Sequence, residues 1–171
     1  MRLSRLTLIL GLYIVVSASF AQQLWVLVER VVGRNQVLVM LTSAFVCLAL
    51  FSIYRHLKSK TGYLRTAFAA IVFFGAYIFA WKQPFMTEKA HVLEYGLLAY
   101  LAMRDLDKDK MKSVASVLYS AAFVLIVGSL DEGFQKMLPY RVGEIRDVIT
   151  NLLSGLFGIA LFLAMKRRSL T

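Results

Sequence analysis

The chain has 171 residues, of which 59% are hydrophobic and 18% are charged. Soluble domains are usually about 45 to 50% apolar, so this composition excludes an ordinary soluble domain and indicates an integral membrane protein. The net charge of +10 would suggest a nucleic-acid partner in a soluble protein. Here most basic residues fall in short loops beside apolar segments, where they orient a protein in the membrane, so we expect no nucleic-acid partner.

Five apolar stretches are long enough to cross a bilayer of about 30 Å as helices of about 20 residues. They are residues 6–28, 37–54, 63–82, 112–130 and 148–165. A sixth stretch, 90–103, is shorter and begins in a charged step, so we expect it to start below the membrane surface. The sequence therefore predicts an all-α, polytopic membrane bundle of about six helices. It forms a single domain over residues 1–171, with an irregular outward-facing segment at about 131–147.

The first apolar stretch has a second interpretation. Arg2 and Arg5 precede an apolar run that ends in Ser19-Phe20-Ala21, which resembles a secretory signal with a cleavage site before Gln22. If cleavage occurs, five helices remain. The tail of this stretch, residues 22–35, mixes polar and apolar residues, which favours a position along the outer interface over a full span.

Basic residues are distributed unevenly between the two sides of the predicted bundle. With the N-terminus inside, thirteen of the twenty Lys and Arg residues fall on the inner side and seven on the outer side. This asymmetry follows the positive-inside rule and predicts that both termini are cytoplasmic. Two clusters of ionisable residues would then face outward.

The first polar cluster is EKAHVLEY at residues 88–95. At 3.6 residues per turn, His91, Glu94 and Tyr95 fall on one face of a helix and can converge on one partner. Lys89 points elsewhere on the helix, and its long stem also suits an anchor at the membrane interface. A His-x-x-Glu pair alone is equally well explained as a hydrogen-bonding device between helices.

The second polar cluster, residues 131–147, is longer and has a helical rhythm. Gly128, Asp131 and Gln135 recur at three and four residues, so the end of one helix presents a polar stripe before Pro139 breaks the chain. The next helix carries a second stripe, formed by Asp147, Asn151, Gly155 and Gly158. The two glycines let neighbouring helices approach closely, which would bring the polar residues of both stripes together.

These groups predict a polar pocket embedded in the membrane. A charge at the bilayer centre costs on the order of 3 kcal/mol, so insertion alone would not retain so many, although ion pairs that only brace the helices remain an alternative. The residue types suit acid–base catalysis, binding of a divalent cation, or clamping of a phosphate. The sequence contains no metal motif of diagnostic spacing, so we assign no metal ligand, and the cofactor question stays open.

The two clusters resemble the signatures of the VanZ-like family of bacterial membrane proteins, whose founding member is linked to teicoplanin resistance. In that family the second stretch contains Asp-Glu, Gln, Pro with Arg, Asp with Asn, and then Gly. This chain supplies them as Asp131, Glu132, Gln135, Pro139, Arg141, Asp147, Asn151 and Gly155. Lys89 and His91 resemble the family's step into the earlier helix. The resemblance covers about residues 85–165 and implies a multi-pass protein of the bacterial cytoplasmic membrane.

From the site and the resemblance, we expect the outward-facing pocket to bind or act on a lipid headgroup or a lipid-linked wall precursor. The expected catalytic residues are His91, Glu94, Asp131 and Asp147. The expected substrate contacts are Lys89, Glu132, Gln135, Arg141 and Asn151. The resemblance also raises glycopeptide resistance as an expectation. Two other classes remain open, a non-catalytic protein that binds lipid or antibiotic and an ion-coupled transporter, although no inverted repeat is visible.

Overall fold

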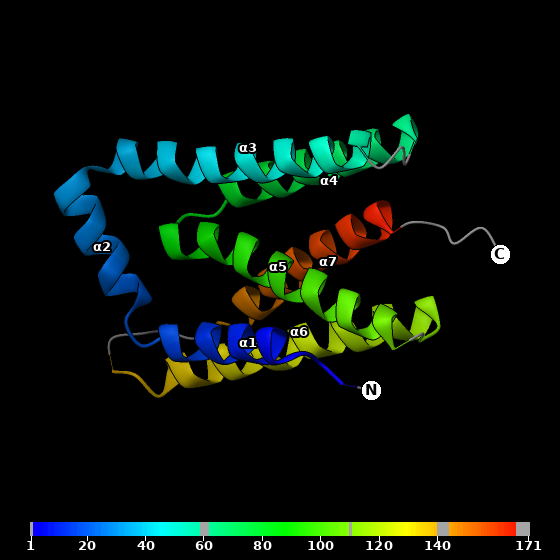
Figure 1. The fold of residues 1–171 in the computed structure, drawn as a ribbon. Helices are drawn as coiled ribbons and strands as arrows, with labels where there is room; N and C mark the ends of the chain where they lie inside the picture. Colours follow the sequence, from blue (N-terminus) through cyan, green and yellow to red (C-terminus); the bar gives the residue numbers. More distant parts are fainter. Residues whose placement is uncertain (1, 59–61, 110, 140–143, 167–171) are drawn as a thin grey trace.

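The computed structural model describes residues 2–58, 62–109, 111–139 and 144–166, and within these ranges helices joined by short turns form the fold (Figure 1). The helices are α1 (Arg5–Ser17), α2 (Ala21–Val32), α3 (Arg34–Lys58), α4 (Tyr63–Trp81), α5 (Met86–Lys108), α6 (Ser113–Lys136) and α7 (Ile145–Met165). Four of them, α3, α4, α6 and α7, are each long and apolar enough to cross a membrane, and α1 and α2 together form a bent pair that also qualifies. The predicted helical membrane bundle is confirmed.

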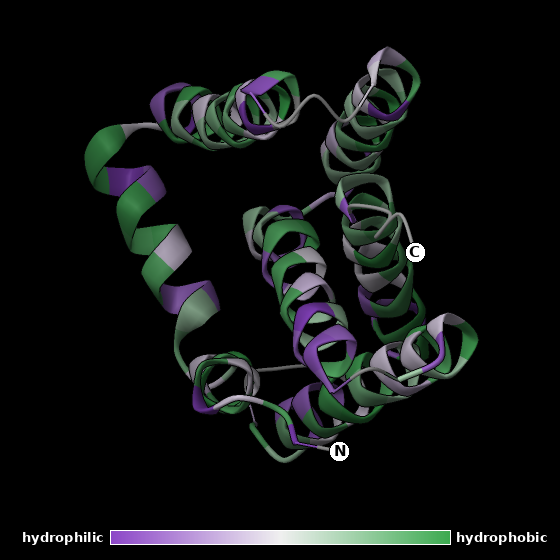
Figure 2. Cartoon of the chain, turned by 45° about the vertical axis from the view of Figure 1, so that its right-hand side comes forward, coloured by the Kyte–Doolittle hydropathy of each residue, from purple (hydrophilic) through white to green (hydrophobic). Residues whose placement is uncertain are grey.

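The stretch predicted as one helix over residues 6–28 is broken, which raises the helix count in the described chain from six to seven. α1 ends at Ser17, and α2 begins at Ala21 at an angle of 74°. Two serine hydroxyls at this break donate to backbone carbonyls of the preceding turn, an arrangement that competes with helix continuation. Hydrophilic and hydrophobic residues alternate along α2 (Figure 2), which runs across one end of the bundle from α1 to α3.

α5 lies at the centre of the fold. Figure 1 shows α5 and α7 as a middle layer between α3 with α4 and α1 with α6. The short helix predicted over 90–103 is in fact part of a helix of 23 residues, of which fourteen are buried. The prediction was too short because the charged ends of α5 read as lying outside the membrane, whereas the surrounding helices bury Lys89, His91 and Asp105.

α5, α6 and α7 meet at glycines. A Cβ atom on Gly158 would overlap the backbone carbonyl of Gly96, and one on Gly155 would lie 2.8 Å from Val124 Cγ1. Only residues without side chains permit this approach of helix backbones. The prediction that these two glycines of α7 allow close packing is confirmed, and it brings the polar stripe of α7 against α5 and α6.

The first residues and the end of α7 lie at the same end of the bundle. Asp105, near the end of α5, accepts hydrogen bonds from Thr7 Oγ1 at 2.5 Å and from the Ser4 backbone amide at 2.9 Å. Lys166 Nζ lies 2.5 Å from Asp107 Oδ1. This arrangement agrees with a topology in which both termini share one side of the membrane.

The two polar clusters meet at the opposite end of the bundle. α6 stays helical through Asp131 and Glu132 as far as Lys136, so the irregular segment expected at about 131–147 is shorter than predicted. In the described chain it comprises residues 137–139 and 144, before α7 begins at Ile145. Both carboxylates have partners within the fold: Tyr95 on α5, Gln135 on α6 itself and the Glu144 backbone amide just before α7.

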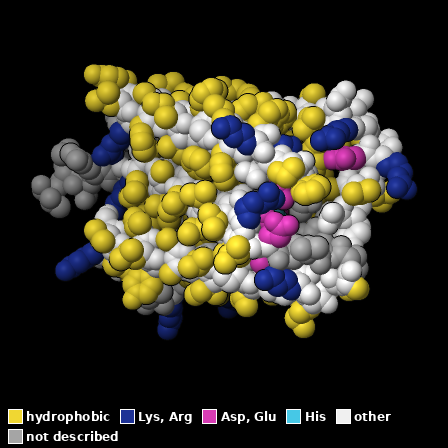
Figure 3. All heavy atoms as spheres, turned by 180° about the vertical axis from the view of Figure 1, so that it is seen from behind, with side chains coloured by type: hydrophobic (Ala, Val, Ile, Leu, Met, Phe, Trp, Pro, Cys, Tyr) yellow, Lys and Arg dark blue, Asp and Glu magenta, His cyan; other side chains and the backbone are white. Residues whose placement is uncertain are grey.

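Apolar side chains cover much of the outer surface. Leu12, Phe74, Val114 and Ile126 are among the large hydrophobic residues that are more than half exposed. Figure 3 shows a broad hydrophobic surface, with the acidic side chains of that face gathered toward one end. An apolar surface of this extent is unfavourable in water and suited to lipid, so the molecule is a multi-pass membrane protein.

Candidate functional site

A pocket of about 280 Å³ lies where the two polar clusters meet, between α2, α5, α6 and α7. Four carboxylates and one guanidinium are among the described groups that line it. The lining residues are Gln22, Phe85, Thr87, Glu88, His91, Glu132, Gln135, Glu144, Arg146, Asp147, Thr150 and Asn151. Residues of both predicted polar clusters therefore line one polar pocket.

His91 lines this pocket from α5 and lies between two carboxylates. Its Nδ1 is 2.8 Å from Glu94 Oε2 on the same helix, and its Nε2 is 3.9 Å from Asp131 Oδ2 on α6. The His91 side chain is 7% exposed, while that of Glu94 is 26% exposed. The hydrogen bond that Nδ1 donates to Glu94 orients the ring and leaves the other nitrogen on the side of Asp131.

Asp131 is fully buried, and both of its oxygens accept hydrogen bonds. The Tyr95 hydroxyl donates to Oδ2 at 2.8 Å, and Gln135 Nε2 donates to Oδ1 at 3.2 Å. Asp131 contacts His91 without being among the pocket's lining residues. Contacts from α5 and α6 together therefore fix the position of Asp131, beside the histidine that lines the pocket.

Glu132 joins α6 to the start of α7. Its Oε1 accepts from Gln135 Nε2 at 3.2 Å, and its Oε2 accepts from the backbone amide of Glu144 at 3.1 Å. Both carboxylate oxygens thus have protein donors. Gln135 serves Asp131 and Glu132 at once, because residues three and four apart share one face of a helix.

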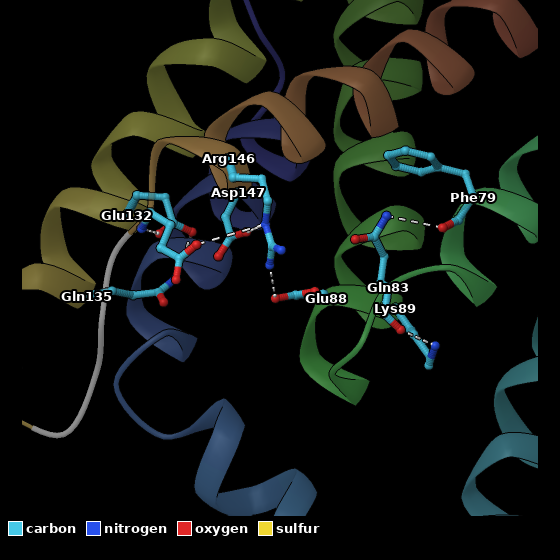
Figure 4. A network of polar contacts seen from close by, with 9 residues as sticks. Phe79, Gln83, Glu88, Lys89, Glu132, Gln135, Arg146 and Asp147 are labelled. Atoms are coloured by element: carbon cyan, nitrogen blue, oxygen red, sulfur yellow. Dashed lines mark hydrogen bonds and ion pairs between the residues drawn. The ribbon is translucent and has the colours of Figure 1, made fainter.

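Arg146 lies at the rim of the pocket among three carboxylates. Its guanidinium is 3.4 Å from Asp147 Oδ1, 3.5 Å from Glu88 Oε1 and 3.9 Å from Glu144 Oε2. Figure 4 shows Arg146 and Asp147 on α7 reaching toward Glu88 on α5. The Arg146 side chain is 60% exposed, so it remains accessible to a ligand that enters from the end of the bundle.

Two polar atoms of pocket-lining residues are buried and lack a hydrogen-bond partner in the described chain. They are Glu88 Oε2 and Asn151 Nδ2. Asn151 is 1% exposed, and its Cβ would lie 3.4 Å from a Cβ on Gly128, so it packs closely against α6. Buried polar atoms are nearly always paired, which makes both atoms candidates for contact with a ligand.

Lys89 lies apart from the pocket. Its Nζ donates to the carbonyls of Trp81 at 3.0 Å and Ala80 at 3.4 Å, and also to the carbonyl of Gln83. The ammonium group also lies 5.5 Å from the centre of the Trp81 ring. Figure 4 shows Lys89 directed toward Gln83 and away from Glu88 and Arg146. In this position its positive charge offsets the partial negative charge at the C-terminal end of α4, and its hydrogen bonds cap the carbonyl groups there.

The structure brings together seven of the nine residues predicted for the site. They are His91, Glu94, Asp131, Glu132, Gln135, Asp147 and Asn151. Lys89 is elsewhere, and Arg141 lies outside the described residues. Sequence reasoning did not select Glu88, Arg146 or Thr150, although Glu88 precedes His91 by three residues and Thr150 follows Asp147 by three. A spacing of three places each pair on one face of a helix, and this spacing could have identified Glu88 and Thr150 from the sequence.

Within the described ranges, no three His, Cys, Asp or Glu side chains are arranged to hold a metal ion. The arrangement does present a buried histidine between two carboxylates at the wall of a polar pocket. A histidine is the residue type that most often accepts and returns a proton in general acid–base chemistry.

The fold and the pocket define a class: a helical, multi-pass membrane protein with a polar pocket at one end of its bundle. A family model described as VanZ/LLP1 matches residues 5–166, nearly the whole chain, and the protein belongs to this family. The resemblance of residues 85–165 is thereby confirmed and extended to α1–α4. No curated protein and no solved structure matches the chain.

Proposed function

We propose that the pocket binds the polar headgroup of an amphipathic envelope component, a membrane lipid or a lipid-linked wall precursor, and that His91 performs acid–base chemistry on it. The observation that carries this proposal is the buried His91 at the wall of a polar pocket, held between Glu94 and Asp131. Structural bracing would need the ion pairs but no cavity beside them.

The apolar sides of the bundle and the polar pocket at one end together suit an amphipathic ligand. Apolar side chains cover the sides of the bundle, while the pocket lies at the end where α2 runs across it. A lipid beside the bundle would therefore have its chains against apolar helices and its headgroup at the level of the pocket. In the topology favoured by the basic residues, this end faces outward from a bacterial cytoplasmic membrane.

In the proposed reaction, His91 takes a proton from a headgroup hydroxyl or a water as that oxygen forms a bond to the acyl or phosphoryl centre of an ester in the headgroup. His91 then donates the proton to the ester oxygen whose bond to the same centre breaks. Glu94 fixes the ring through Nδ1, and Asp131 provides a compensating negative charge 3.9 Å from Nε2. Arg146, which pairs with Asp147 at the rim, contacts a phosphate of the headgroup there. Arg141, which lies outside the described residues, is proposed from the family resemblance alone as a further phosphate contact. Gln135 orients Asp131.

Family membership connects this proposal with teicoplanin. A protein that alters or covers a lipid-linked wall precursor would change how much of that precursor a glycopeptide can bind. Increased tolerance of teicoplanin would then accompany activity at the pocket.

The test is profiling of membrane lipids and lipid-linked wall precursors in a deletion strain complemented with the wild-type gene or a His91→Gln version. We expect one species to accumulate on deletion and to clear only with the wild-type gene, at equal membrane abundance of both proteins. Identical profiles in all strains would refute the chemistry. Saturable binding of a lipid by purified protein without a product would then assign the pocket to binding.

A further inference from the structure

The hydrogen bonds inside the pocket leave two buried polar atoms of the described lining without a partner. Glu132 uses both oxygens on Gln135 and Glu144, and Arg146 is shared by carboxylates at the rim. What remains in the described lining is one buried acceptor, Glu88 Oε2, and one buried donor, Asn151 Nδ2, each without a partner. A ligand that pairs both atoms removes the cost of leaving them unpaired.

A hydroxyl group suits these two atoms, one acceptor and one donor, because it both donates and accepts hydrogen bonds. It can donate to Glu88 and accept from Asn151, and two neighbouring hydroxyls can divide these roles. Phosphate oxygens would leave the Glu88 acceptor unpaired, and an ammonium group would leave the Asn151 donor unpaired. Because the pocket contains one unpaired acceptor and one unpaired donor, it favours a ligand group that can both donate and accept hydrogen bonds.

The charges of the pocket favour the same choice. Four carboxylates but one described guanidinium line it, so a bare phosphate moving into the interior would meet net repulsion. Arg146 is exposed at the rim, where a phosphate can remain hydrated while it pairs with the guanidinium. Thr87 and Thr150 add hydroxyl groups to the lining, and these adapt to either donor or acceptor.

We infer that the part of the headgroup that enters the pocket is an uncharged, hydroxyl-bearing group of the sugar or glycerol type, hydrogen-bonded to Glu88 and Asn151. This inference rests on the proposed function and names the chemical class of its ligand. Any phosphate of the same headgroup stays at the Arg146 rim.

The experiment titrates the purified full-length protein in detergent with four lipids of identical acyl chains and measures the bound fraction by native mass spectrometry. The lipids are glucosyl-diacylglycerol, phosphatidylglycerol, phosphatidylethanolamine and phosphatidic acid. We expect the first two, which carry free hydroxyls, to bind on the order of tenfold more tightly than the other two.

Two variants test the atoms themselves. Asn151→Leu removes the donor, and Glu88→Gln replaces the carboxylate with an amide of the same shape, so the second variant remains informative if the first does not fold. We expect each variant to weaken binding of the hydroxylated lipids on the order of tenfold. Binding of phosphatidic acid should stay unchanged. Ser120→Ala is the matched control, because Ser120 Oγ is also buried and unpaired in the described chain but lies outside the pocket lining.

The outcomes separate the two proposals. Preferential binding of phosphatidylethanolamine or phosphatidic acid, or variants that bind like wild type, would overturn the inference and leave lipid binding intact. No binding of any of the four lipids above a control membrane protein would overturn both the inference and the proposed headgroup site.

Discussion

Asp131 connects α6 with α5 beside the candidate site. It is fully buried, accepts from Tyr95 and Gln135, and lies 3.9 Å from His91 Nε2. A buried carboxylate with donors on both oxygens is a well-supported acceptor, so Asp131 is held in a defined position beside the histidine.

We expect Asp131→Asn to abolish activity at the pocket and to leave membrane abundance close to wild type. The substitution keeps the shape of the side chain but removes the charge beside His91, and it presents an amide donor to the Tyr95 hydroxyl or the Gln135 amide. Lipid profiles and quantitative immunoblots of the same membranes check both halves of this expectation. If activity and abundance fall together, Asp131 braces the helices and is not needed for chemistry.

Lys89 has a geometry that predicts a role in stability. Because it donates to three carbonyls around the end of α4, Lys89→Met should lower the free energy of unfolding by about 1 to 3 kcal/mol. Thermal unfolding in detergent measures the effect, with Lys136→Met at the exposed end of α6 as the control. Weaker lipid binding at unchanged stability would instead restore the substrate contact that the sequence predicted.

At the level of elements, the close approach of α5 and α7 depends on glycine. The carbonyl of Gly96 occupies the space that a side chain at Gly158 would need, and the adjustment would have to involve two helix backbones. Packed interiors accommodate such overlap poorly.

Gly158→Ala should therefore destabilise the protein by about 1 to 3 kcal/mol or more and disturb the pocket, since α7 carries Asp147 and Asn151. Gly133→Ala is the control, because a Cβ on Gly133 in α6 would meet nothing within 4 Å. Melting curves and size-exclusion profiles of the two variants measure the difference. Equal stability of both variants would show that α5 and α7 can separate without cost.

The attachment of α1 can be tested in the same way. Thr7→Val removes the hydroxyl that donates to the buried Asp105 carboxylate, and we expect a loss of about 1 to 3 kcal/mol with earlier protease cleavage near the N-terminus. Thr42→Val is matched to it, since the Thr42 hydroxyl donates to the Leu38 carbonyl of its own helix. Similar losses in both variants would mean that the Thr7–Asp105 hydrogen bond does not hold α1 in place.

For the whole molecule, the sequence predicted the features that follow from hydropathy and helical spacing. Apolar stretches located the membrane helices. The spacing of Asp131 with Gln135 and of Asp147 with Asn151 predicted two polar stripes, of which Gln135, Asp147 and Asn151 line the pocket. These features are local, because each helix presents its own residues at a period of 3.6.

The features that the sequence did not predict depend on tertiary contacts. The apolar run through residues 6–28 concealed the break after Ser17, because hydropathy does not register a change of direction. Lys89 turns toward the end of α4, and Arg146 pairs with Glu88, 58 residues earlier. No periodicity links such partners, so the membership of the pocket could be predicted only in part.

The burial of α5 has a consequence for biosynthesis. This helix carries Lys89, His91 and Asp105 in buried positions near its two ends. Ionisable groups oppose the insertion of an isolated helix there as well, although less than at the membrane centre. Two of the helices that shield it, α6 and α7, are made later in the chain. We therefore expect α5 to remain near the insertion machinery until α6 and α7 have been synthesised, so that the three helices enter the bilayer as one unit.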